Sequence, residues 1–208
     1  MDIQIDSAGL TDISAAGQRV TLTRSVNQAV EAVTTNAGGL TVAWQAFSPM
    51  QNNAVNWSDG QYYCFASTTP VAMNMVIEMN SQSDAAMQIG YVYQFAQGRF
   101  TMQQPQQGGS WYIVSNATQG SFAFGLAQSA IVNNQPVLAP FCLVPILYNQ
   151  QAYFTPSGMI GVFLSSASAA GTLLPPPSNP CFVSAPTGDS TEPTVGFNDQ
   201  TNTFYQIS

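Results

Sequence analysis

The chain has 208 residues, of which 45% are apolar and only 6% are charged, and it carries a net charge of −7 with no histidine and no lysine. A chain without these two residue types cannot build a Ser-His-Asp or Cys-His catalytic site, a Schiff base or a phosphate-binding loop lysine. Its three basic residues are too few to neutralise nucleic-acid phosphates, so we expect no direct contact with nucleic acid. The length fits a single domain over residues 1–208.

Alternating apolar and polar residues run through most of the chain and predict β-strands. The predicted strands cover residues 3–5, 40–46, 62–67, 71–79, 87–95, 111–115, 121–127, 137–144, 159–164, 181–184 and 203–207. We expect the strands at 71–79 and 87–95 to pair antiparallel through the turn-rich segment between them. Many short strands at this spacing predict an all-β fold, an antiparallel β-sandwich, with a jelly-roll-like topology favoured over an immunoglobulin-like one.

One short helix is predicted near residues 25–35, where apolar residues recur at helical spacing after Ser25 and Gln28 takes the place of a capping-box partner. The same segment also alternates with period two from Val20 onward, so a strand remains the alternative. The segments 102–110 and 172–181, which are rich in glutamine, glycine or proline, are expected to be loops.

The few charged residues form no recognisable reaction centre. Arg19 and Arg24 are expected to pair with carboxylates or backbone carbonyls. The ten acidic residues lie mostly in turns, and no two of them stand out as a glycosidase-type acid and base. Asp189, Glu192 and Asp199 leave calcium open as a weaker alternative, although their spacing matches no EF-hand. We therefore predict no catalytic residue, no metal, no cofactor, and a protein that is not an enzyme.

Cys64, Cys142 and Cys181 are widely spaced and odd in number, which argues against a complete set of disulfides. We expect buried free thiols, because free cysteine is among the most buried residue types. One disulfide, within the chain or between subunits, is the alternative, and for a bond between subunits all three are candidate intersubunit cysteines. Zinc is not expected, because without histidine the site would need a carboxylate as its fourth ligand.

An aromatic ring beside amide side chains is typical of sugar sites, where the ring packs on the apolar face of the sugar and the amides bind its hydroxyls. The candidate sugar-binding residues are Asn53, Asn56, Trp57, Asp59, Tyr62, Trp111 and Tyr112. An exposed Trp57 or Trp111 ringed by amides would favour this interpretation. The alternative is that the tryptophans belong to the core or to strand edges of the sandwich.

No membrane span is predicted, because the most apolar stretch, residues 137–147, is interrupted by Pro140 and Pro145. The first residues include Asp2 and Asp6 and contain neither a basic nor an apolar signal region, so no signal peptide is predicted. The location is left open by the sequence, with a virion or an intracellular assembly favoured.

The 21 Gln, 14 Asn, 20 Ser and 17 Thr must cover most of the surface in place of charged residues. Proteins use lysine above all to keep sheet edges apart, and lysine and glutamate are depleted from interfaces. We therefore predict a non-catalytic structural protein that packs with copies of itself or with other shell proteins into a regular assembly: a virion shell or decoration layer, a filament, or a protein crystal or inclusion. The alternative is a lectin, whose partner would be a glycan.

Overall fold

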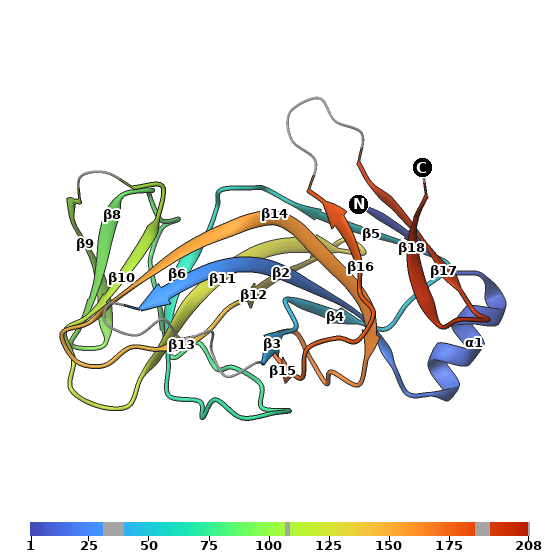
Figure 1. Ribbon diagram of the computed structural model, residues 1–208, viewed down its shortest axis with the longest axis horizontal. Coiled ribbons are helices and arrows are strands. Elements are labelled where there is room, and N and C mark those ends of the chain that lie inside the picture. The colour runs from blue at the N-terminus through green and yellow to red at the C-terminus, as the bar shows by residue number, and fades with distance from the viewer. Residues whose placement is uncertain (31–39, 107–108, 186–191, 208) are drawn as a thin grey trace.

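The computed structural model describes residues 1–30, 40–106, 109–185 and 192–207. Two main β-sheets pack as an elongated sandwich, and the one helix of these residues, α1 (Ser7–Ala15), lies toward one end of it (Figure 1). The predicted all-β sandwich is confirmed. The sheet order does not confirm a jelly roll. Two pairs are parallel, β1 (Asp2–Gln4) with β17 (Thr194–Asn198) and β8 (Tyr91–Ala96) with β10 (Tyr112–Asn116), so both sheets are mixed.

The first sheet has nine strands and is organised around β11. In spatial order the strands are β18 (Thr203–Ile207), β17, β1, β5 (Asn52–Trp57), β11 (Ala123–Val132), β6 (Tyr63–Ser67) and β7 (Ser81–Gln82), and beside that path β12 (Gln135–Pro140) and β13 (Val144–Pro145) pair with β11. The first half of β11 pairs with β6 and its last residues pair with β5. A single long strand therefore joins the two halves of this sheet.

The second sheet has seven strands and is organised around the longest strand. In spatial order the strands are β4 (Gln45–Phe47), β2 (Arg19–Val30), β14 (Gln151–Ser165), β10, β8 and β9 (Arg99–Pro105), and β16 (Cys181–Ser184) pairs with β14 beside that path. β2 and β14 pair over nearly their whole length, with an irregularity between Pro156 and Ile160. A small separate sheet joins β3 (Thr41–Val42) to β15 (Leu173–Leu174).

The main hydrophobic core fills the space between the two sheets. Trp44, Phe95, Phe124 and Phe154 are fully buried there and come from both sheets and from the segment before β4. Each such side chain contributes about 1.5–3 kcal/mol on burial, so this layer is the main source of stability. No helix in the described part of the chain is long and apolar enough to cross a membrane.

The helix expected near residues 25–35 is not found where the structure describes that segment. Residues 25–30 belong to β2, and residues 31–35 lie outside the described residues. Their β-branched and apolar residues pair with β14, and this pairing outweighs a weak helical spacing. The helix that does form, α1, begins after Asp6, whose carboxylate accepts a hydrogen bond from the Gly9 N–H at 2.8 Å.

The strand expected at residues 71–79 is also wrong. Only an isolated bridge between Val76 and Thr172 forms there, and Met73 and Met75 of the alternating row are exposed. The hairpin predicted between 71–79 and 87–95 therefore does not exist, and β8 pairs instead with β9 and β10. Alternation alone does not select a strand, because a strand also needs a partner edge.

Candidate functional site

Arg24 is the one arginine whose side chain is buried, and it joins the two sheets. It lies in the middle of β2 in the seven-stranded sheet. Its Nη1 donates a hydrogen bond to Oε1 of Gln128 in β11, and its Nη2 pairs with Oδ1 of Asp59 at 3.1 Å. Both acceptors belong to the opposite side of the sandwich, so one guanidinium links the layers.

Three aromatic rings surround this guanidinium. Its central carbon lies 5.4 Å from the ring centroid of Trp44, 5.5 Å from that of Tyr62 and 5.9 Å from that of Phe141. Desolvated cation–π contacts contribute about 2 kcal/mol, which offsets part of the cost of burying the charge. We call Arg24, Trp44, Asp59, Tyr62, Gln128 and Phe141 the Arg24 cluster.

The Arg24 cluster is suited to holding the sheets together rather than to proton transfer. Burial raises the pKa of the Tyr62 hydroxyl, and the nearby Arg24 charge opposes that rise without cancelling it. The tyrosine therefore remains neutral at physiological pH. The indole N–H of Trp44 donates to the backbone oxygen of Gln128 at 3.2 Å, which fixes the ring against β11.

Four of the candidate sugar-binding residues come together at this cluster. Trp57 Nε1 donates to Oδ1 of Asp59 at 3.1 Å, and the Tyr62 ring packs edge-on against Tyr112 with centroids 5.1 Å apart. Tyr62 and Tyr112 are buried, so their rings offer no face to a ligand. The Asp59 oxygen is shared between Trp57 and Arg24, which makes it a structural acceptor.

The structure places Asn53 and Trp111 in other surroundings. Asn53 is buried, and its Nδ2 donates to the backbone oxygens of Ile3 and Met50 at 3.2 and 2.7 Å, so it fastens β5 to the neighbouring β1. Trp111 is 41% exposed and packs edge-on against Tyr153. The predicted sugar-binding set is therefore not one site.

A shallow hollow of about 250 Å³ keeps part of the sugar-site arrangement. The half-buried Trp57 lines it together with Asn56, Gln61, Tyr63 and Ser129. Amides and hydroxyls thus lie around an indole whose far side packs edge-on against Trp44. This combination offers both a surface for a sugar ring and hydrogen-bonding groups for its hydroxyls.

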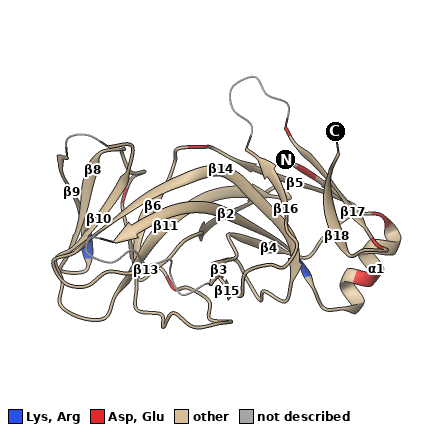
Figure 2. Ribbon diagram, viewed as in Figure 1, with Lys and Arg blue, Asp and Glu red and all other residues tan. Residues whose placement is uncertain are grey.

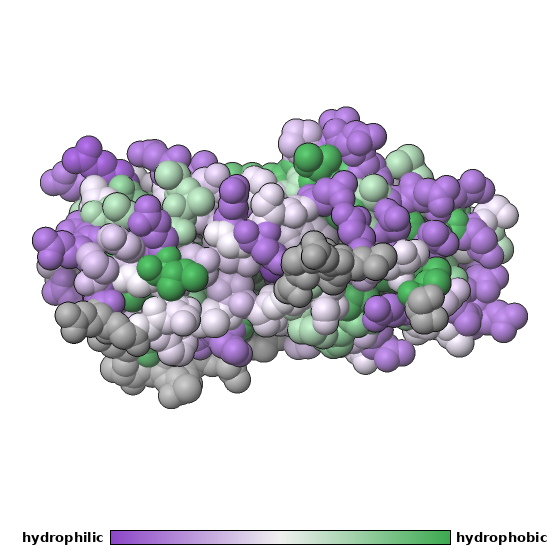
Figure 3. Space-filling model, turned by 90° about the horizontal axis from the view of Figure 1, so that it is seen from above, coloured by the Kyte–Doolittle hydropathy of each residue, from purple (hydrophilic) through white to green (hydrophobic). Residues whose placement is uncertain are grey.

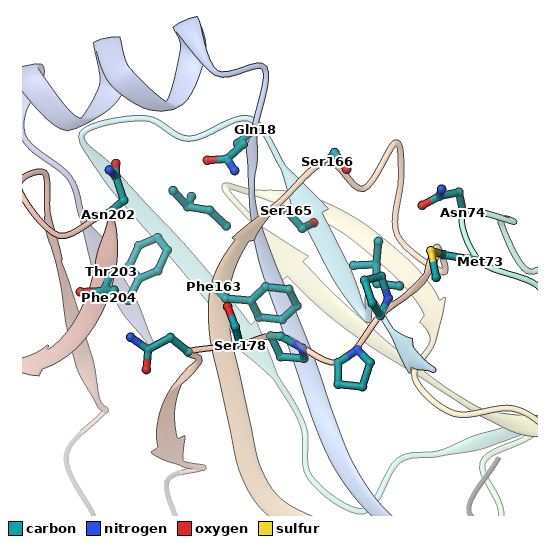
Figure 4. A pocket seen from close by; sticks show the side chains of 16 residues that line it. Gln18, Met73, Asn74, Phe163, Ser165, Ser166, Ser178, Asn202, Thr203 and Phe204 are labelled. Carbon is teal, nitrogen blue, oxygen red and sulfur yellow. The ribbon is translucent and has the colours of Figure 1, made fainter. Parts of the chain in front are cut away.

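A larger cavity of about 560 Å³ fits a sugar less well (Figure 4). Figure 4 shows Ser165 near the ring of Phe163, and Asn202 near the ring of Phe204. None of the described residues that line this cavity is charged. Its two aromatic residues, Phe163 and Phe204, are only 8% and 6% exposed, so the cavity lacks an open ring face.

From the sequence, Arg24 is expected only to pair with a carboxylate or a backbone carbonyl, although its position in the alternating pattern also indicates that it is buried between the sheets. Val20, Leu22 and Arg24 are alternate residues of β2 and therefore lie on the same face of the strand, where Val20 and Leu22 contact the core. Period-two alternation therefore places the arginine on the buried face as well. A buried arginine requires a carboxylate or amide partner, and Gln128 of β11 supplies one.

The three cysteines are free thiols in different surroundings. Cys64 and Cys142 are buried, and burial raises the pKa of each thiol to about 12, so both remain protonated and unreactive at neutral pH. Cys181 in β16 is partly exposed, and burial raises its pKa as well. Of the three candidate intersubunit cysteines, Cys181 is therefore the one with access to another molecule.

The strands at the sheet edges have almost no charge. Among the described strands, β4, β7, β9, β12, β16 and β18 each pair on one side only. Arg99 at the start of β9 is the only charged residue within these six strands. β12 contains Pro136 and Pro140, which lack the N–H that pairing with another strand requires. Most of β9 and the last three residues of β18 are exposed, and the one proline in these two strands is Pro105 at the end of β9.

The rest of the surface follows the same pattern. Figure 2 shows acidic and basic positions at only a few places along the ribbon. Two ion pairs occur among the described residues, Arg24 with Asp59 and the Met1 amino group with Glu192 at 2.9 Å. The face in Figure 3 is mostly hydrophilic or intermediate, with apolar side chains as separate spots. Its hydrophilic character therefore comes mainly from uncharged amides and hydroxyls.

Comparison with known proteins gives no relative: no family model, no curated protein and no solved structure matches the chain. Within the described residues, no group of three or more Cys, Asp or Glu side chains lies close enough to hold a metal ion.

Proposed function

We propose that this protein is a non-catalytic structural protein that packs into a regular assembly, such as a virion shell or decoration layer, a filament, or a protein crystal or inclusion. The observation that carries the proposal is the lack of charge on the one-sided strands, where Arg99 is the only ionised side chain. An edge without lysine pairs with another chain at little cost in ionic desolvation or repulsion.

The two most accessible edges lie far apart on the molecule. β9 is at one end of the long axis, and β18 lies toward the other end beside the C-terminus (Figure 1). Two different edges at opposite ends favour a head-to-tail contact, because joining β9 of one copy to β18 of the next can continue indefinitely. Such a heterologous contact produces a filament, or a closed ring where the rotation between copies allows it.

The test is the mass of the purified protein by light scattering over a concentration series, with and without reductant. We expect species well above the 22.1 kDa of one chain, growing with concentration. Gln103→Lys in β9 and Gln206→Lys in β18 each place an ammonium on an exposed edge position and are expected to lower that mass.

The matched control is Ala15→Lys at the exposed end of α1, which adds the same charge away from any strand edge. It should leave the mass unchanged. A 22.1 kDa monomer at every concentration, or an equal loss of mass in the control, would contradict assembly through these edges. A loss of mass on reduction alone would instead assign the contact to a disulfide, with Cys181 the accessible thiol.

The hollow beside Trp57 supports a second candidate function, binding of a neutral glycan. Glycan-array binding that is lost in Asn56→Ala and Gln61→Ala would support it, because both side chains line the hollow without holding the Arg24 cluster. Gln206→Ala on β18 is the control. An unchanged binding pattern in the two hollow variants would place any glycan elsewhere.

A further inference from the structure

A cavity of about 580 Å³ lies beside the edge strands β4 and β12 and is separate from the hollow at Trp57. Its walls are mainly apolar and come from both sheets and from the segments around Met79 and Ala170. Phe47, Val137 and Leu138 are among the side chains that line it, and each remains partly exposed. The volume lies within the range of about 300–1,000 Å³ that is usual for small-molecule sites.

One cation borders this apolar cavity. Among the described residues that line it, Arg19 is the only charged one. Neither of the two ion pairs in the described part of the chain includes Arg19, and no hydrogen bond of its guanidinium is formed there. Arg19 is half-buried and has no carboxylate partner among the described residues, although the chain has ten acidic residues and only three basic ones.

Gln45 is another polar residue in the wall of this cavity, but its amide nitrogen does not face the open space. Gln45 is 1% exposed, and its Nε2 has no hydrogen-bond partner among the described residues. Because that nitrogen is enclosed by protein atoms, a ligand in the cavity does not accept a hydrogen bond from it.

We propose that this cavity binds a small monocarboxylate with an apolar tail. The Arg19 guanidinium matches a carboxylate in charge and in its forked geometry. The apolar walls take the tail. A sugar is a poorer match, because the walls offer it few hydrogen-bonding groups, and a phosphate ester is a poorer match because one guanidinium leaves its second charge uncompensated. This site is independent of the proposed assembly function.

The test is isothermal titration calorimetry of the full-length protein with decanoate. We expect saturable binding of one decanoate per chain. Decanol, which keeps the tail, and acetate, which keeps the carboxylate, should each bind about tenfold more weakly or worse, because each loses one of the two recognised parts. Arg19→Gln should weaken decanoate binding by about tenfold or more while leaving decanol binding unchanged.

Arg99→Gln is the matched control, since it removes the same charge from an exposed strand start that does not line the cavity, and it should bind decanoate as the unmodified chain does. Ser168→Trp fills the exposed rim of the cavity and should abolish binding, with circular dichroism confirming that both cavity variants keep the fold. Absence of decanoate binding, equal affinity for decanol, or unchanged binding in Arg19→Gln or Ser168→Trp would each overturn the proposal.

Discussion

The interior around Arg24 and the edge strand β9 use charge in opposite ways. In the interior, one guanidinium is enclosed by three aromatic rings and held by Gln128 and Asp59 across the sandwich. Along β9, seven residues with one side unpaired carry a single charge, at Arg99. Most proteins do the reverse, with apolar interiors and charged edges. The buried charge of Arg24 therefore stabilises the internal packing, whereas β9 has almost no charge that would oppose close contact with another chain.

Removal of the buried guanidinium should have the largest effect. Arg24→Leu leaves Gln128 Oε1 without its donor and opens space between Trp44, Tyr62 and Phe141, so we expect the free energy of unfolding to fall by about 1–3 kcal/mol. Urea unfolding measures this. Arg99→Leu on the open edge is the control and should change stability by no more than about 0.5 kcal/mol. Equal effects in the two variants would remove the contrast between interior and edge.

The buried thiols should make the interior sensitive to alkaline pH. Cys64 and Cys142 have a pKa of about 12 in the folded chain and about 9 when unfolded, so between pH 9 and 12 the unfolded chain loses protons that the folded chain keeps. Stability is therefore full below pH 9 and falls as the pH rises, by up to about 1.4 kcal/mol per pH unit for each thiol. Urea unfolding with reductant at pH 8, 9 and 10 measures the slope, and Cys142→Ala should lessen it. A flat profile would show that the thiols are less enclosed than in this structure.

Asp59 should matter much less than its partner. Its side chain is 41% exposed, so solvent screens the ion pair, and Asp59→Asn keeps an oxygen that accepts from Arg24 and Trp57. We expect a loss of about 1 kcal/mol or less in the free energy of unfolding. A loss as large as that of Arg24→Leu would mean that the ion pair, rather than the aromatic rings and Gln128, holds the guanidinium.

The smallest effect on stability is expected at the edge itself. Gln103→Lys in β9 changes an exposed side chain, so the free energy of unfolding should stay within about 0.5 kcal/mol of the unmodified protein. The same variant is expected to lower the assembled mass measured by light scattering. A change in the free energy of unfolding without a change in assembled mass would mean that Gln103 contributes to stability and not to assembly.

Several elements could be predicted from the sequence because their alternation matches their environment. β6, β10 and β18 form at residues where a strand is predicted, since their apolar side chains pack on the core, on both faces of β6 and β10 and through Phe204 in β18. Other elements depend on partners that lie far away in the chain. Residues 52–57, interpreted as part of a sugar site, form β5 because β1 and β11 flank them. β9 covers residues 99–105 and so enters the loop predicted at 102–110, because β8 provides an edge with which it pairs.

The candidate sites also differ in how far the sequence could indicate them. The residue types at Trp57 and its amide neighbours indicated a sugar site, but only the fold shows that Trp57 and Asp59 also hold the Arg24 cluster and that Asn53 fastens β5 to β1. The cavity at Arg19 and Gln45 has no local signal, because its walls come from segments as distant as Phe47 and Ala170. Composition and alternation are local properties, whereas a cavity is defined by which surfaces meet.

By itself, the sequence determined the all-β class and a surface of uncharged amides and hydroxyls, because composition and period-two alternation depend only on residue type and order. The tertiary structure decided the rest: that residues 25–30 extend β2, that the alternating segment at 71–79 forms only an isolated bridge, and that Arg24 is enclosed between the sheets. Strand pairing and burial are set by contacts between distant segments, whose free energies exceed the small local preferences that a sequence pattern records.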